Sequence, residues 1–228
     1  MPTLTFESVL QSLDPFPVLG NSYTNGDYVP LDLSVNNPDL QTVNVSSSDD
    51  LETHIWKHIK SNNGTIAYGG YIEKRGIYNR SGHFNQDNPY TERNIHLGMD
   101  LWIAEDTAIY APIDGVVHGL KDNTGYGNYG PTLILKHKLN GVKFYSLYGH
   151  LSSRSLNKKR LGENITKGQQ IATLGKAEEN GDYPPHLHFQ IIKDIEDYSG
   201  DYPGVSSQKD LKFYKSNCPN PNLLLRLF

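Results

Sequence analysis

His186–Ile192, with the sequence HLHFQII, is the stretch that decides how this chain folds. Successive side chains of a β-strand point to opposite faces of a sheet. The leucine, the phenylalanine and the first isoleucine can therefore enter a core, while His186 and His188 point the other way. On that face the two imidazoles are neighbours, roughly 7 Å apart at the backbone. The stretch predicts a strand with one face in the core and a pair of histidines on the other.

Short runs of the same kind, separated by glycine and proline, recur throughout residues 66–195. Further strands are expected at Thr65–Tyr71, Gly115–Leu120, Thr132–Lys138, Val142–Leu147 and Gln169–Leu174. Short strands at such spacing are typical of an all-β sandwich or barrel. We therefore expect a mainly β fold.

The first 65 residues differ from this pattern, because they are acidic and rich in turn-forming residues. A short helix is expected from Phe6, and a second helix from Asp50 to Lys60 with serines before it as N-caps and Gly64 as its stop. The tail is expected to be irregular until Asn222–Phe228, whose leucines should anchor it to the body of the protein. We divide the chain into a small, partly helical N-terminal extension over residues 1–65 and a β domain over residues 66–228.

Composition excludes several classes of function. The 228 residues carry a formal net charge of −4, which provides no basic field for a nucleic acid backbone. No stretch approaches the ~20 apolar residues of a membrane helix, so no membrane span is expected. Cys218 is the single cysteine, and no internal disulfide can form. No Lys or Arg precedes Lys57, so a secretory signal is not expected. The chain is expected to act in the cytoplasm, unless a leader has been removed.

A second motif places an imidazole and a carboxylate on one side of an extended segment. In HLGMD (residues 96–100), His96 and Asp100 lie four positions apart, opposite the apolar residues between them. Catalytic zinc takes three nitrogen or oxygen ligands from the protein and keeps one open position. His96, Asp100 and one member of the pair His186 and His188 supply such a set. The HExxH helix of another zinc peptidase class is absent from the sequence.

A third motif ends the strand expected at Val142–Leu147. Continued alternation would place Ser146, Tyr148 and His150 on one face. The other histidines carry less information: His118 and His137 lie in or beside expected strands, and we interpret them as structural groups.

The three motifs HLGMD (96–100), LYGHL (147–151) and HLHF (186–189), in this order, resemble the M23 family of zinc metallopeptidases. The text between them, including APIDGVV (111–117) and GYGNYG (125–130), fits the same family, and the resemblance covers about residues 66–195. YIEKRGIY (71–78) is similar to a subset of M23 domains that occur fused to phosphotransferase and aminotransferase domains, without export signals.

The resemblance implies a role for each motif residue. His96, Asp100 and His188 would bind one zinc ion. His150 and His186 would be catalytic, handling the proton of the metal-bound water and stabilising the tetrahedral intermediate. Zinc lowers the pKa of bound water to about 7, which suits an imidazole with a pKa near 6.5. Tyr90 and Tyr148 are the candidates for substrate contact.

The family fold implied is an antiparallel β-sheet of the M23 type (duplicated hybrid motif), with a groove across the sheet and zinc on its floor. Family substrates are peptides cut beside small residues, such as glycine bridges or stem peptides of bacterial peptidoglycan. The sequence departs from secreted members because it shows no signal peptide and no wall-binding module. The acidic N-terminal extension is a candidate cap of the groove.

Three alternatives to an endopeptidase remain open at this point. A non-catalytic M23-like domain would only bind a partner. Such a domain would not need zinc ligands, whereas this sequence has a ligand residue at each of the three positions. A phosphocarrier domain of related architecture uses two neighbouring histidines, but the Asp100 carboxylate would repel a phosphoryl group. A zinc hydrolase of a small cytoplasmic metabolite or peptide fits the missing export signal.

The two histidines of the HLHF motif are predicted to respond differently to substitution. His188→Ala should remove zinc and peptidase activity together, because the site loses one of three ligands. His186→Ala or His150→Ala should retain zinc and lower turnover by about 10²–10⁴-fold. Metal analysis beside a peptide-cleavage assay distinguishes the two. Loss of metal in His186→Ala and its retention in His188→Ala would reverse the assignment.

Overall fold

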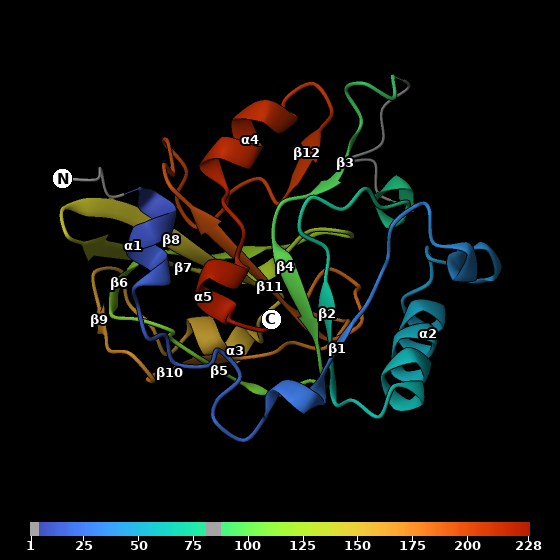
Figure 1. Cartoon of the computed structure of the whole chain (residues 1–228), viewed down its shortest axis with the longest axis horizontal. Helices are drawn as coiled ribbons and strands as arrows, with labels where there is room; N and C mark the ends of the chain where they lie inside the picture. The colour runs from blue at the N-terminus through green and yellow to red at the C-terminus, as the bar shows by residue number, and fades with distance from the viewer. Residues whose placement is uncertain (1–4, 81–87) are drawn as a thin grey trace.

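The expected mainly β architecture is confirmed in a computed structural model, which describes residues 5–80 and 88–228. Its centre is a twisted eight-stranded sheet (Figure 1). In spatial order its strands are β1 (Tyr28–Pro30), β2 (Ile66–Gly69), β4 (Met99–Trp102), β11 (His186–Ile192), β8 (Val142–Gly149), β7 (Gly130–Leu139), β6 (Gly115–Asn123) and β9 (Asn164–Ile165). All neighbours in this sheet are antiparallel except β1 and β2, which run parallel.

Two small sheets and several short helices complete the described part of the chain. β3 (Arg93–His96) pairs with β12 (Val205–Ser207), and β5 (Ala108–Tyr110) pairs with β10 (Gln170–Thr173). The helices are α1 (Phe6–Gln11), α2 (Ser48–Ser61), α3 (Ser153–Leu156), α4 (Leu211–Asn217) and α5 (Asn222–Leu225), with 3₁₀ turns at Asn25–Asp27, Pro38–Thr42 and Ile77–Arg80. Among the described residues, no helix is long and apolar enough to cross a membrane.

β11 coincides with the predicted strand and lies in the middle of the sheet, between β4 and β8. All seven of its residues are buried. The alternation is as expected: Leu187, Phe189 and Ile191 belong to the main hydrophobic core, and the histidines lie on the opposite face. The register places His188 beside Asp100 of β4 on one side and beside Gly149 of β8 on the other.

The main core lies under one face of the sheet and is closed by both ends of the chain. Apolar side chains of α1 and α5, such as Leu10 and Leu224, join those of the strands. Arg226 fixes this arrangement, since its guanidinium donates hydrogen bonds to the carbonyls of Leu10 and Gln11. The predicted anchoring of the C-terminal leucines to the body is therefore confirmed.

The N-terminal section contributes to the same sheet and to a second hydrophobic cluster. α2 begins where the Ser47 side chain accepts a hydrogen bond from the backbone N–H of Asp50, two residues before the predicted start. Its buried face packs with apolar residues of the β domain, among them Trp102 and Tyr183. β1 extends the large sheet beside β2 (Figure 1). The division of the chain at residue 65 stays a prediction.

The C-terminal tail holds a helix that the sequence did not predict. α4 spans seven residues, and Asn217 is its buried member, while Phe213 is half exposed. A helix this short shows too few apolar repeats to be recognised from periodicity. Asn217 ties it to the loop after β11, through side-chain hydrogen bonds with the backbone of Asp194.

His137 on β7 is a structural histidine, as expected, and it makes stability depend on pH. The ring is 1% exposed and lies 2.7 Å from both the Asp114 carbonyl and the Ser146 hydroxyl. Burial lowers its pKa to about 4. Because the unfolded chain binds this proton near pH 6.5, stability is lost as pH falls from about 6.5 towards 4.

Between pH 7 and pH 5 this histidine should therefore reduce the free energy of unfolding by roughly 2 kcal/mol. Urea unfolding of the wild type and of His137→Gln at both pH values measures the effect. The variant should be less stable at pH 7, and the difference from the wild type should shrink by this amount at pH 5. The other buried histidines are common to both proteins and cancel. An equal difference at both pH values would contradict the prediction.

Candidate metal centre

A cavity of about 290 Å³ lies on the histidine-bearing face of β4 and β11. Segments from most of the chain surround it, including the N-terminal section and the loop before β12. Besides the motif residues, the lining includes Leu33, Leu51, Arg75, Tyr78, Arg93, Trp102, Tyr129, Tyr183, Tyr198, Asp201, Tyr202 and Gly204.

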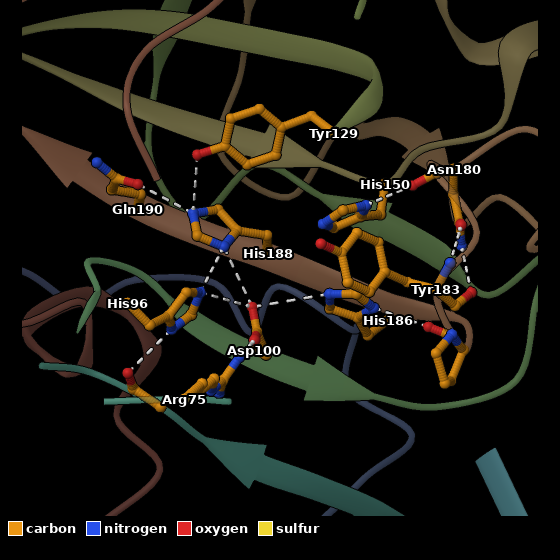
Figure 2. Close-up of polar contacts among 12 residues, drawn as sticks. Arg75, His96, Asp100, Tyr129, His150, Asn180, Tyr183, His186, His188 and Gln190 are labelled. Carbon is orange, nitrogen blue, oxygen red and sulfur yellow. Dashed lines mark hydrogen bonds and ion pairs between the residues drawn. The ribbon is translucent and has the colours of Figure 1, made fainter. Parts of the chain in front are cut away.

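His96, Asp100 and His188 meet on the floor of this cavity (Figure 2). One potential ligand atom from each lies within 4.8 Å of the other two. Nε2 of His96 is 2.8 Å from Nδ1 of His188. Oδ1 of Asp100 lies 3.3 Å and 3.2 Å from these two nitrogens. The three side chains come from the end of β3, from β4 and from β11, and each is at most 2% exposed.

The outer hydrogen bonds of the two imidazoles fix where each ring carries its hydrogen. Nδ1 of His96 lies 2.9 Å from the Gly70 carbonyl, which can only accept, so this nitrogen donates. Burial lowers the pKa of His96 to about 4, so the ring is neutral at pH 7 and Nε2 presents a lone pair.

His188 is held the opposite way round. Its Nε2 lies 2.9 Å from Oε1 of Gln190. The orientation of that amide is assigned from its other partners, because its Nε2 donates to the Pro203 carbonyl and to the Cys218 sulfur. Oε1 therefore accepts from Nε2 of His188, and Nδ1 of that ring faces His96.

Three potential ligand atoms thus converge on one point: one nitrogen of each imidazole and a carboxylate oxygen. Two lone pairs facing each other at 2.8 Å repel unless a cation or a proton lies between them. The donor set, nitrogen and oxygen with outer hydrogen bonds that orient each ring, is the one zinc takes in catalytic sites. The residues present therefore fit a zinc ion.

Asp100 is ionised in this arrangement. Burial opposes the charged form, but the neighbouring His96 and the guanidinium of Arg75 outweigh it and hold the pKa of the carboxyl well below its usual range. Nη1 of Arg75 donates to Oδ2 of Asp100 at 2.6 Å. Neither Arg75 nor Gln190 was identified from the sequence. Arg75 lies 25 residues from Asp100, and the orientation of the Gln190 amide depends on contacts with the distant Pro203 and Cys218.

His150 and His186 form a second pair beside the first, with ring centres 4.2 Å apart. Nδ1 of His150 donates to the Asn180 carbonyl, and Nδ1 of His186 donates to the Pro184 carbonyl. Burial lowers the pKa of both rings. Each is therefore a neutral imidazole with an available lone pair on Nε2, and Nε2 of His186 lies 3.9 Å from Oδ1 of Asp100.

The expectation that Tyr148 and His150 share a face is wrong. His150 has φ of +61°, a left-handed conformation that breaks the alternation after Gly149 and turns the imidazole into the cavity. Tyr148 stays on the core side, where it is fully buried, packs against Phe189 and shares a hydrogen bond with Ser146. It has no exposed surface with which to contact a substrate.

Tyr90 is 56% exposed and does not line the cavity. The structure places Tyr129 there instead, with its ring centre 5.1 Å from that of His188 and its hydroxyl 3.4 Å from Nε2. A Cβ at Gly149 or at Gly204 would lie 2.7 Å or 1.9 Å from Tyr129 atoms, so its position requires glycine at both. Tyr129 belongs to the GYGNYG motif (125–130), which is the sequence feature that could have identified it.

Comparison with known proteins agrees with this geometry. The model of peptidase family M23 matches residues 94–199. Residues 94–199 therefore resemble the M23 family, and the mainly β sheet described above matches the M23 type of fold.

An uncharacterized metalloprotease of Haemophilus influenzae is 32% identical over 108 residues, which is 47% of this chain and 21% of that protein. The chain thus matches about a fifth of the length of this curated relative. A zinc-containing peptidase of Vibrio cholerae is 30% identical, with 47% of this chain and 31% of that chain covered and a TM-score of 0.34. The catalytic domain of lysostaphin from Staphylococcus simulans is 20% identical, with 58% and 93% covered and a TM-score of 0.35.

Gly98, between two of the converging residues, is predicted to be essential for the position of His188. A Cβ at residue 98 would lie 2.4 Å from Cε1 and 2.6 Å from Nε2 of that ring, and 2.9 Å from the Phe189 carbonyl. Gly98→Ala should therefore displace the imidazole and weaken zinc binding by at least about tenfold. Gly76→Ala is the control, since its Cβ would have no neighbour closer than 3.8 Å. Titration with Zn²⁺ against a chelator measures both, and equal affinities would contradict the prediction.

Proposed function

We propose that this chain is a zinc-dependent metallopeptidase, with His96, Asp100 and His188 as the ligands of one zinc ion. The observation that carries the proposal is the meeting of two buried imidazole nitrogens at 2.8 Å beside the carboxylate of Asp100. The resemblance to the M23 family supports the same conclusion. A domain that only binds a partner has no use for three buried donors without a cation.

A zinc ion bound here would polarise a peptide carbonyl and lower the pKa of its bound water to about 7. The chain's own residues would then manage the proton. Nε2 of His186 or His150 accepts it from the attacking water, and the same imidazole returns it to the leaving amine. Their lowered pKa values keep both rings unprotonated at neutral pH, ready to accept.

The cavity supports a substrate with small side chains at the cleaved bond. Its volume of about 290 Å³ is at the low end for ligand pockets. Tyr129, Tyr183 and Trp102 form rigid aromatic walls around the histidines. Glycine-rich peptides and peptidoglycan stem or bridge peptides are the substrate class we propose.

The N-terminal extension is proposed to cap one side of this groove. Leu33 and Leu51 line the cavity although both are almost completely buried. Two polar contacts join the extension to the loops on the other side. The Tyr126 hydroxyl donates to the Ser46 carbonyl, and the Ser48 hydroxyl donates to Asp182. Such a wall favours short peptides over long polymers.

The same enclosure supports a second candidate function, hydrolysis of a small cytoplasmic peptide or metabolite at the same zinc site. The buried floor, on which each ligand is at most 2% exposed, favours a small substrate. The two candidates share the metal and the histidines and differ only in the substrate.

The first experiment is elemental analysis of tag-free protein beside Asp100→Ala, followed by cleavage assays with peptides. We expect about one zinc per wild-type chain and none in the variant, because the carboxylate is one of three ligands. Glycine peptides of two to eight residues and isolated stem peptides should then be compared with intact peptidoglycan. The metallopeptidase predicts zinc-dependent cleavage, fastest for the short peptides.

Each outcome separates the candidates. Zinc bound without cleavage of any peptide would favour the small-metabolite hydrolase. Cleavage of intact peptidoglycan at the rate of short peptides would contradict the proposed cap. A folded wild-type chain that takes up no zinc, even after reconstitution, would refute the metallopeptidase.

A further inference from the structure

We propose that Arg75 is a positioning residue for the metal site: it occupies one oxygen of Asp100, so that only the other oxygen is offered to the metal. The inference rests on the proposed zinc site and assigns a role to a residue outside the segment that matches the M23 family, residues 94–199. It follows from the contacts of a single guanidinium.

The two oxygens of Asp100 have separate partners. Oδ2 accepts a hydrogen bond of 2.6 Å from Nη1 of Arg75. Oδ1 lies 3.2 Å from Nδ1 of His188 and 3.3 Å from Nε2 of His96. Figure 2 shows the guanidinium on one side of the carboxylate and the imidazoles on the other. A cation between the imidazoles would therefore meet Oδ1, while Oδ2 is held away from it.

Arg75 is itself fixed on two further sides. Its Nε donates to Oε2 of Glu73 at 2.5 Å, and Oε1 of the same carboxylate accepts from the backbone N–H of Leu33. The guanidinium also lies over the Trp102 ring, 5.4 Å from its centre. A planar group held in this way has one orientation available, which is what a carboxylate clamp needs.

The burial of Arg75 lowers the stability of the folded chain. Arg75 is 4% exposed, and its Nη2 is buried without a hydrogen-bond partner among the described residues. A buried donor without a partner destabilises the folded state, and a buried ion pair contributes little more to stability than apolar residues of similar volume. Stability alone does not account for an arginine here, whereas orienting the Asp100 carboxylate does.

The same short segment orients a second ligand. The Gly70 carbonyl accepts from Nδ1 of His96, and the carbonyl of Glu73 accepts from the backbone N–H of His96. Residue 70 must be glycine, because it has φ of +101° and a Cβ there would lie 2.0 Å from Nη2 of Arg75. Residues 70–75 thus set the direction of two of the three proposed ligands.

The chemical consequence concerns the open positions of the metal. Catalytic zinc sites combine three protein ligand atoms with a position for water or substrate. If both carboxylate oxygens coordinated, one of those positions would be filled by the protein. By holding Oδ2, Arg75 limits Asp100 to one coordinating atom.

The test uses Arg75→Met and Arg75→Lys in the full chain, with Zn²⁺ affinity and the visible absorption of bound Co²⁺ as readouts. Met keeps the length of the side chain but removes its charge and donors. Zn²⁺ affinity should fall by about 10–100-fold, as for other residues that orient a ligand. The absorption of Co²⁺ should weaken, because release of Oδ2 raises the coordination number and four-coordinate Co²⁺ absorbs most strongly.

Lys74→Met is the matched control, since it makes the same kind of substitution one residue away, at an exposed side chain. It should retain the Co²⁺ spectrum of the wild type. Arg75→Lys, which keeps the charge without the planar fork, should change in the same direction as Arg75→Met, and it decides the question if the Met variant does not fold. Variants with wild-type or tighter Zn²⁺ affinity and an unchanged Co²⁺ spectrum would overturn the proposal. A wild type that binds neither metal would instead refute the proposed zinc site, and the role of Arg75 with it.

Discussion

The facing nitrogens of His96 and His188 are 2.8 Å apart, and each ring has a hydrogen-bond acceptor on its far side. This contact is unfavourable unless a cation or a proton lies between the two nitrogens, and the ionised carboxylate of Asp100 lies next to it. The surrounding sheet must supply the free energy that holds these groups together. The register of the strands and the packing of the core meet that requirement.

The sheet holds these three side chains together through the register of its strands rather than through loops. Asp100 and His188 are direct partners on adjacent antiparallel strands, and His96 ends the short strand that precedes β4. The apolar neighbours of Asp100 and His188 along their strands enter the main core on the opposite face; they are Met99, Leu101, Leu187 and Phe189. Moving one strand by one residue would exchange the two faces, so the burial of Leu187 and Phe189 also fixes the ligands. The packing of the core therefore also determines the arrangement of the site.

The features that depend on the alternation of side chains along a strand could be predicted from the sequence. The strand over residues 186–192, the face on which its histidines lie and the mainly β fold all follow from periodicity and spacing. The direction of the His150 side chain could not be predicted from alternation. The positive φ of His150 turns its imidazole to the other face of the sheet, while Tyr148 stays in the core. Tyr129 was contained in a glycine-rich motif whose geometry only the fold reveals.

Arg75 marks a second limit of sequence reasoning. It lies 25 residues from Asp100 in the chain, with no periodic relation to it, so only the folded chain brings the two together. Buried arginines are rare, and nothing in a lone sequence indicates which arginine will be buried. A similar argument applies to Gln190, which reads as an ordinary polar residue of a strand until its amide is found between His188 and the Pro203 carbonyl.

The N-terminal section connects the metal site to the question of substrate access. Leu51 lines the cavity and at the same time packs in a cluster with Trp102 and Tyr183, two residues of its aromatic wall. The proposed cap cannot lift off as a unit without exposing that cluster and separating β1 from β2. Exposing such apolar side chains costs about 25 cal/mol for each Å². Entry of a substrate therefore has to use smaller movements, of side chains or of the loops that Ser46 and Ser48 contact, and this argues for short peptides at the proposed zinc site.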